Sequence, residues 1–299
     1  LYRKVHPPTA SLSSLVNENW ARINENTFKG LVSMLHVIGI IPARFGSTRF
    51  PGKPLVPIAG IPLLQRCFEN SRLAHSITSL VVATDDLRIV KLVESFGGEV
   101  FLTSPECATG SDRLAELLHR HPSWQEADAI VNIQGDEPCI PPNAIDAAVS
   151  LLLKDPSAVV ATLATPCLSP EEAMDLSVVK CVTDQFHNAL YFSRNWIPGN
   201  KKGAYSSRYP TLRHLGLYVY RPHFLLQYGQ LPATPLQIEE DLEQLKILEH
   251  GYKIKVALCS ECPPGVDTPK DIESIEQWIC KKQNISSSRE ESALPSEKD

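Results

Sequence analysis

The stretch IGIIPARFGSTRFPGKPL, residues 38–55, joins an apolar run directly to a basic loop. The run predicts a buried strand over residues 36–43. The loop carries Arg44, Arg49 and Lys53 beside glycines and hydroxyl residues, so that positive charge and exposed backbone N–H groups suit an anion such as a phosphate. From these residues alone, a solvated surface loop that binds nothing is an equally good interpretation.

The loop does not have the spacing of a P-loop. Five residues rather than four lie between Gly46 and Gly52, and Pro54 follows Lys53 where a P-loop has the hydroxyl residue that ligates magnesium. Any phosphate bound here must therefore be held by a different arrangement of backbone and side chains.

Strand-like runs alternate with helical patterns after this loop. We expect strands over 77–85, 99–103 and 128–136, and helices over 62–74, 86–97, 111–121 and 141–155. This alternation predicts an α/β fold with a mostly parallel sheet and helices on both faces. Ligands of such sheets bind beyond the carboxyl ends of the strands, so the loops that follow the strands are expected to converge on one rim.

The pattern changes after residue 157. Short β-like runs over 158–166, 178–184, 188–194 and 213–221 predict a mixed sheet or an inserted subdomain. A helix over 238–251, a strand over 252–259 and a last helix from Pro269 follow. Residues 281–299 are polar and predicted to be disordered. Residues 1–35 are interpreted as an N-terminal extension, either the remainder of a targeting segment or a disordered segment.

Composition limits the classes of function. The 299 residues carry a formal net charge of −5, which argues against a nucleic-acid or membrane-surface partner. No apolar run reaches the length of about 18 residues that a membrane span needs. The eight cysteines are scattered, and the single Cys259-x-x-Cys262 pair lacks the second ligand pair of a zinc site. We therefore expect free thiols and an intracellular location, cytoplasmic or organelle-associated.

Two carboxylates complete the candidate site. Asp136 ends an apolar strand at the predicted rim, and Asp267 lies in the segment GVDTP before the last helix. Oxygen ligands on both sides of a phosphate-binding loop suit a magnesium ion bound with a triphosphate. For Asp267, an N-cap of the helix from Pro269 is a competing interpretation.

Eight segments in this order resemble the cytidylyltransferases that activate 3-deoxy-manno-octulosonate (KDO), the CMP-KDO synthetases. They are IIPARFGSTRFPGKPL, VVATDD, GSDRLAE, VNIQGDEP, YFSR, RHLGLYVYR, LEQLKILEHG and GVDTPKD, between about residues 36 and 275. The segment LQIEEDLEQLKILEHGYK is most similar to the plant members, and members usually show Gly-Thr-Glu-Arg where this chain has Gly110–Arg113. The resemblance implies a Rossmann-like nucleotidyltransferase sheet over 36–280, with a smaller mixed β subdomain at about 180–235 for sugar binding and dimerisation.

The resemblance also implies the reaction and the residue roles. Family members join CTP to KDO, giving CMP-KDO and pyrophosphate. By this resemblance, Arg44 and Lys53 hold the triphosphate with help from Arg49, and Asp136 and Asp267 ligate Mg²⁺; Arg44, Lys53, Asp136 and Asp267 are the catalytic set. The nucleotide pocket would further include Ala43, Thr84, Asp85, Arg113 and Gln134. The sugar-acid pocket would comprise Arg194, His214, Tyr218, Glu243 and Gln244.

The residues by themselves leave alternatives open. The Arg194 guanidinium suits a carboxylate but also a surface ion pair. His214 suits sugar hydroxyls but also a hydrogen-bonded core position, and Glu243 and Gln244 suit a solvated helix face. Two competing functions are a cytidylyltransferase for another sugar acid, such as a sialic acid, and a nucleotide-binding protein without catalysis. The resemblance also implies a homodimer.

Overall fold

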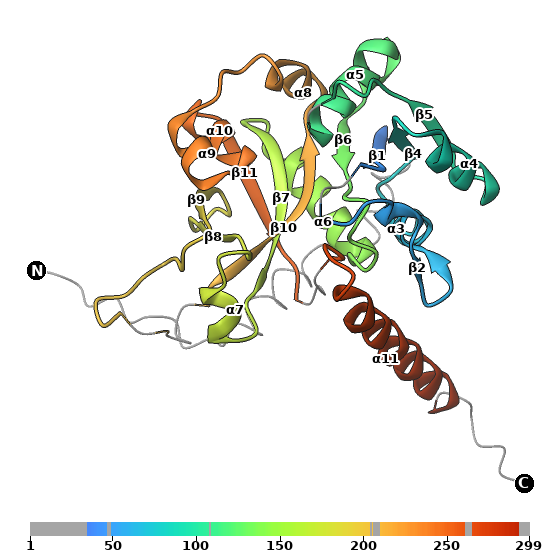
Figure 1. The fold of residues 1–299 in the computed structure, drawn as a ribbon. Helices are drawn as coiled ribbons and strands as arrows, with labels where there is room; N and C mark the ends of the chain where they lie inside the picture. Colours follow the sequence, from blue (N-terminus) through green and yellow to red (C-terminus); the bar gives the residue numbers. More distant parts are fainter. Residues whose placement is uncertain are drawn as a thin grey trace, which may run out of the picture.

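The computed structural model describes residues 35–46, 49–107, 109–203, 205, 210–260 and 265–292. The predicted N-terminal extension therefore lies outside the described residues as far as residue 34, as do Ser47, Thr48 and Cys262. Figure 1 shows a central sheet with helices packed around it and one long carboxyl-terminal helix that projects from it. Within the described residues, no helix is both long and apolar enough to cross a membrane.

Strands and helices alternate in the first half of the described chain. They are β1 (Val37–Ala43), η1 (Lys53–Leu55), β2 (Pro57–Ile58), β3 (Ile61–Pro62), α3 (Leu63–Ser71), β4 (Ser79–Thr84), α4 (Leu87–Ser95), β5 (Glu99–Leu102), α5 (Gly110–Arg120), η2 (Pro122–Glu126), β6 (Ala129–Asn132) and α6 (Pro142–Lys154). The second half holds β7 (Ala158–Pro166), α7 (Pro170–Met174), β8 (Lys180–Thr183), β9 (Ala189–Ser193), β10 (Leu212–Tyr220), α8 (Pro222–Tyr228), α9 (Pro235–Glu240), α10 (Glu243–Glu249), β11 (Lys253–Leu258) and α11 (Asp271–Ser292).

The main sheet has the strand order β11-β7-β10-β6-β1-β4-β5. Strand β1 pairs in parallel with β4 and β6, β4 with β5, and β11 with β7, whereas β10 runs antiparallel between β6 and β7. The predicted α/β fold with a mostly parallel sheet is confirmed. The carboxyl ends of β1, β4 and β6 consequently open on the same rim.

Two apolar layers cover the sheet, one on each face. One layer packs α3, α4 and α6 against the sheet through residues such as Leu64, Val93 and Val149. The other packs α5, α8 and α10 through residues such as Leu117 and Phe224. Both layers are needed because the central strands are apolar on both faces; β1 is buried along almost its entire length.

Of the two alternatives for the β-like runs after residue 157, the structure shows the mixed sheet. Strands β7 and β10 belong to the main sheet. Strands β8 and β9 branch from it, and β8 pairs with Leu212 and Arg213 at the amino-terminal end of β10. A bulge between Leu215 and Tyr218 divides β10. The carboxyl-terminal part of β10 therefore pairs within the main sheet between β6 and β7, and its amino-terminal end also pairs with the branch.

The prediction of a single helix over 238–251 is wrong. The structure has α9, ending at Glu240, and α10, beginning at Glu243, with Asp241 between them at φ 52° in the left-handed region. A residue in that conformation ends a right-handed helix, which explains the break.

The last helix is longer than the sequence predicts and is tied to the core. Its backbone is helical to Ser292, beyond residue 281, where the sequence predicts a disordered tail. Ile275 and Ile279 of α11 are buried together with Ile58, Leu63 and Val266. The segment that carries Asp267 is thereby held between β2–β3, α3 and α11.

Candidate active site

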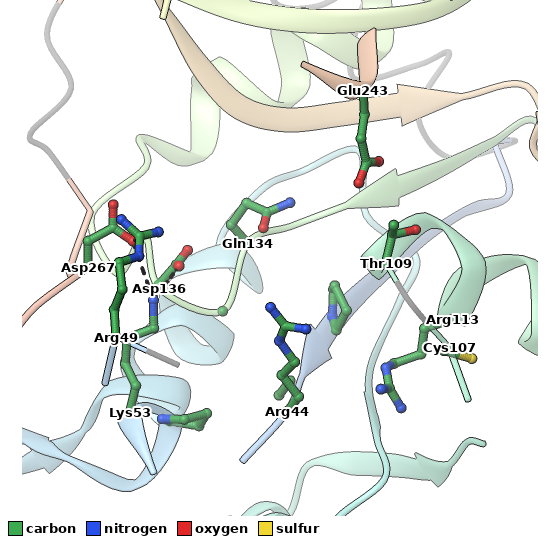
Figure 2. Close-up of a pocket in the computed structure, with 15 residues that line it drawn as sticks. Arg44, Arg49, Lys53, Cys107, Thr109, Arg113, Gln134, Asp136, Glu243 and Asp267 are labelled. Carbon is green, nitrogen blue, oxygen red and sulfur yellow. Dashed lines mark hydrogen bonds and ion pairs between the residues drawn. The ribbon is translucent and has the colours of Figure 1, made fainter. Parts of the chain in front are cut away.

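A cavity of about 350 Å³ opens at the carboxyl ends of β1 and β6. This volume lies in the range of small-molecule sites. The lining residues are Pro42, Ala43, Arg44, Arg49, Lys53, Pro54, Cys107, Thr109, Gly110, Arg113, Gln134, Gly135, Asp136, Glu243 and Asp267. The quoted loop, the segment after β6 and the segment before α11 thus meet at the predicted rim, as Figure 2 shows.

Three ionic contacts join the loop to the two carboxylates. The Lys53 Nζ lies 2.6 Å from a carboxylate oxygen of Asp136 and 3.7 Å from one of Asp267. Arg49 donates to Asp267 over 3.2 Å. The Lys53 side chain is only 13% exposed, so its contacts with the carboxylates are screened less than a surface ion pair.

The backbone holds the two carboxylate segments side by side. The N–H of Val266 donates to the carbonyl of Asp136 over 2.8 Å. Helix α11 begins at Asp271, whose carboxylate accepts the N–H groups of Asp267 and Thr268 at 2.9 and 2.7 Å. The competing interpretation of Asp267 as the N-cap is therefore wrong, and its carboxylate faces the loop cations instead.

The carboxylate pair fits a divalent cation. Asp136 and Asp267 converge on one positively charged atom, the Lys53 Nζ, which shows that their oxygens can share a cation. No group of three or more His, Cys, Asp or Glu side chains suited to a metal occurs in the part of the chain that the structure describes. The chain thus offers two oxygen ligands, and a Mg²⁺ ion would complete its shell with water or substrate oxygens.

Glu137 lies behind the pair and is wedged between two glycines. A Cβ on Gly265 would lie 3.1 Å from the Glu137 Cγ, and one on Gly216 of β10 would lie 3.4 Å from its Oε1. The N–H of Gly216 donates to the carboxyl group. Burial, followed by the nearby Asp136 carboxylate, raises the pKa of Glu137 to about 7. The Glu137 side chain therefore sets the separation between β10 and the segment that carries Asp267.

Arg113 forms the opposite wall of the cavity. Its buried guanidinium donates to the Asp85 carboxylate over 2.9 Å and to the hydroxyl of Thr103. Helix α5 begins below it with a capping box in which Thr109 and Asp112 exchange side-chain and backbone hydrogen bonds. Asp85 does not itself line the cavity, but it orients the Arg113 side chain, which does.

Thr84 and Arg44 lie at opposite extremes of exposure. Thr84 is fully buried, and its hydroxyl accepts the N–H of Asp86 over 3.2 Å, so this residue supports the turn after β4. Arg44 is exposed and projects into the middle of the cavity, as Figure 2 shows. Its guanidinium is therefore available to a ligand.

Four of the predicted sugar-acid residues are close together beside the cavity. The Glu243 side chain points into the cavity (Figure 2). Loss of surrounding water, and then the Asp112 carboxylate, raise its pKa. The Tyr218 hydroxyl donates to the buried Gln244 amide oxygen over 3.2 Å, and the ring of Tyr218 lies 5.4 Å from that of His214.

His214 is neutral and its tautomer follows from its partner. Burial lowers the pKa of His214 to about 3. Its Nε2 lies 2.9 Å from the hydroxyl of Thr162, and that hydroxyl donates to the Leu217 carbonyl over 2.7 Å. Because the hydroxyl has one hydrogen, the imidazole must donate from Nε2, which leaves Nδ1 as an acceptor.

Arg194 does not line the cavity. Its Nε donates to the carbonyl of Glu240 over 2.8 Å, and its terminal nitrogens lie 3.1 and 3.5 Å from the carbonyls of Asp241 and Leu176. The guanidinium therefore holds the turn between α9 and α10, immediately before Glu243 and Gln244.

Some lining residues were not predicted from the sequence. Pro42, Pro54, Cys107, Thr109, Gly110 and Gly135 all line the cavity. The spacing of Thr109 and Asp112 carries a recognisable signal, since a hydroxyl residue three positions before an acidic one marks a helix start. Cys107 carries no such signal; its thiol donates to Glu116 over 3.1 Å, and burial, then that carboxylate, raise its pKa to about 11.

Comparisons with known proteins identify the family of the chain. Residues 38–254 match the family model described as cytidylyltransferase. A 3-deoxy-manno-octulosonate cytidylyltransferase of Protochlamydia amoebophila (strain UWE25) is 58% identical, over 83% of this chain and 96% of the relative. A plant relative from Arabidopsis thaliana, named 3-deoxy-manno-octulosonate cytidylyltransferase, mitochondrial, is 48% identical, over 84% of this chain and 85% of its own.

A solved structure is similar over the same region. It is a CMP:2-keto-3-deoxy-manno-octonic acid synthetase complexed with CTP, with 37% identity and a TM-score of 0.77, and the similarity covers 83% of this chain and 99% of that one. The chain therefore belongs to the cytidylyltransferase family and, within it, to the 3-deoxy-manno-octulosonate cytidylyltransferases.

Proposed function

We propose that this protein transfers CMP from CTP to KDO and releases pyrophosphate. The observation that carries the proposal is the contact of Lys53 with both Asp136 and Asp267 in the cavity that also holds Arg44. A basic loop and a carboxylate pair in one cavity are what a nucleoside triphosphate and its metal require. The names of the similar proteins supply the identity of the nucleotide and of the sugar acid.

The reaction is an in-line attack of the anomeric hydroxyl of KDO on the α-phosphorus of CTP. Such a transfer depends on positioning and on charge stabilisation. Arg44 and Lys53 stabilise the charge that develops on the α-phosphate and on the departing pyrophosphate, and Arg49 contacts the outer phosphates. Asp136 and Asp267 would hold the metal, and Mg²⁺ bound there would orient the sugar hydroxyl and lower its pKa.

The two walls of the cavity divide the substrates between them. Ala43, Gln134 and the Asp85–Arg113 pair form the nucleotide side, with Thr84 supporting the turn behind them. Glu243, Gln244, Tyr218 and His214 form the sugar-acid side, where carboxylate, amide and imidazole groups suit a polyhydroxylated acid. Arg194 contributes to this side through the turn that precedes Glu243.

The first test is pyrophosphate release by the purified protein with CTP and Mg²⁺, comparing KDO, N-acetylneuraminate and no acceptor. We expect release with KDO only. Release with N-acetylneuraminate instead would keep the nucleotide assignments and overturn those of the sugar-acid side. Binding of CTP without release for any acceptor would favour a nucleotide-binding protein without catalysis.

We also infer that the protein forms a homodimer. Large apolar side chains are exposed on the branch and on α9, among them Phe186 (74% exposed), Leu190 (61%) and Ile238 (70%). Strands β8 and β9 and helix α9 lie on the same side of the molecule in Figure 1. A second copy that covers this side would remove the apolar side chains from water.

A location inside an organelle is a further proposal. It is supported by the name of the Arabidopsis relative, which includes the word mitochondrial. Microscopy of the full-length protein fused to a fluorescent reporter tests it, and a diffuse cytoplasmic signal would contradict it.

A further inference from the structure

Phe45 anchors both ends of the basic loop. It follows Arg44, and its half-buried ring packs against the apolar layer between the sheet and helices α3, α4 and α6. Its carbonyl accepts the N–H of Gly52 over 2.9 Å. Gly52 has φ 73°, and a Cβ there would lie 3.2 Å from two carbons of the Phe45 ring. The loop therefore closes on Phe45 just before Lys53.

Arg88 of α4 covers the ring of Phe45. Its guanidinium carbon lies 3.2 Å from the ring centroid, a close cation–π contact. Arg88 donates from Nε and from a terminal nitrogen to the two carboxylate oxygens of Asp86, over 2.9 and 2.5 Å. This bidentate contact fixes the plane of the guanidinium, and it also lowers the pKa of Asp86.

The contacts of Arg88 affect the basic loop more than they affect the free energy of unfolding. The Arg88 side chain is 57% exposed, and an ion pair at such a position contributes little to the free energy of unfolding. Neither Arg88 nor Asp86 lines the cavity. The ring that Arg88 covers, however, is next in sequence to Arg44, and Gly52 beneath it is next to Lys53.

We propose that Asp86, Arg88 and Phe45 form a clamp that pre-orders the triphosphate-binding loop, with Arg88 as a positioning residue for Arg44 and Lys53. This inference rests on the proposed function. Without the clamp, CTP must itself order the loop, and the lost conformational freedom weakens its binding. The chemistry of a bound nucleotide is unaffected once the loop is ordered, because neither Arg88 nor Asp86 lines the cavity.

The test compares Arg88→Ala with Arg88→Lys, using Lys91→Ala on the same helix as the matched control. CTP affinity is measured by calorimetry, and KM and kcat by pyrophosphate release. For Arg88→Ala we expect the Kd and KM for CTP to rise roughly three- to tenfold, the range of a cation–π contact. We expect kcat at saturating CTP and the KM for KDO to stay within about twofold, and exposed Lys91→Ala to match the unsubstituted protein.

The lysine and phenylalanine variants separate the clamp from simple charge attraction. Arg88→Lys keeps the charge but loses the flat, bidentate guanidinium, so we expect it to bind CTP almost as weakly as Arg88→Ala. Phe45→Tyr keeps the aromatic ring, so we expect it to bind CTP with normal affinity. Phe45→Leu loses the ring, so we expect it to bind CTP as weakly as Arg88→Ala. Unchanged affinity in Arg88→Ala, or full affinity in Arg88→Lys, would overturn the clamp.

The two proposals fail in different ways. Absence of pyrophosphate release in the unsubstituted protein would overturn the proposed function, while the calorimetric comparison would still decide whether the clamp orders the loop. Normal release together with unchanged CTP affinity in Arg88→Ala would overturn the clamp alone. A melting temperature within a few degrees of the unsubstituted protein confirms that the variants fold.

Discussion

Lys53 is the residue through which the basic loop and the two carboxylates meet. Replacing it by Ala removes the charge that we propose stabilises the α-phosphate and the leaving pyrophosphate. We expect turnover to fall about 10²–10³-fold, the scale of one lost oxyanion donor. Steady-state pyrophosphate release measures this effect, with Lys91→Ala as the control for loss of a lysine elsewhere. Near-normal turnover in a folded Lys53→Ala protein would remove Lys53 from the catalytic set.

His214 makes the stability of the protein depend on pH. Its pKa is about 3 when folded and about 6.5 when unfolded, so between these values the unfolded state binds the additional proton. The free energy of unfolding contributed by His214 is fully present above pH 6.5 and falls as the pH drops toward 3, by about 2 kcal/mol at pH 5.

The substitution His214→Gln isolates this effect. A glutamine can still donate to the Thr162 hydroxyl but does not titrate. Urea unfolding at pH 7 and pH 5 should therefore show a smaller loss of stability in the variant than in the unsubstituted protein, with the other histidines common to both. An equal loss in the two proteins would mean that His214 is charged or solvated when folded.

Individual residues differ in how far their sequence neighbourhood predicts their role. Arg44 follows β1 directly, and Lys53 and Asp136 lie in the loops after β1 and β6, so alternation of strands and helices is enough to bring them to one rim. Arg194 also follows a strand, but two of its partners, the carbonyls of Glu240 and Asp241, are more than forty positions away in the chain. Local sequence contains no information on such contacts, which arise only when β9 packs beside the α9–α10 turn.

At the level of elements, the turn between α9 and α10 is the feature that local propensity misses. The residues on both sides of Asp241 favour helix, and a continuous helix is the natural prediction. The carbonyls of Glu240 and Asp241 instead accept hydrogen bonds from Arg194, and the Glu240 carboxylate accepts the Arg194 N–H over 2.8 Å. Tertiary contacts thus override the helical preference and set where α10 begins.

Substitutions at Asp241 test the importance of this turn. The left-handed conformation is costly for a β-branched residue and free of strain for glycine. We expect Asp241→Val to lower the free energy of unfolding by about 1–2 kcal/mol and to raise the KM for KDO, because Glu243 and Gln244 start the next helix. Asp241→Gly should preserve both quantities, as urea unfolding and kinetics would show. A tolerated valine would mean that the turn adapts freely.

At the level of the whole molecule, the exposed apolar side chains on the branch predict how copies associate. Leu190→Asp places a charge on this surface, and we expect it to convert a dimer into a monomer because burying an unpaired carboxylate is costly. Light scattering after size-exclusion chromatography measures the mass. Leu73→Asp is the matched control, since Leu73 is 66% exposed but lies after α3, away from the branch. A dimer that persists in Leu190→Asp would place the interface elsewhere.

The contact of Lys53 with two carboxylates has a consequence for the order in which ligands enter. The Lys53 ammonium already contacts Asp136 and Asp267, so a magnesium ion that bound these carboxylates would have to displace it. If the proposed function holds, we expect a bound triphosphate to draw the lysine toward its own oxygens and to leave the two carboxylates without their counter-ion. We therefore expect the nucleotide to bind first and magnesium to bind more tightly once Lys53 has left the two carboxylates.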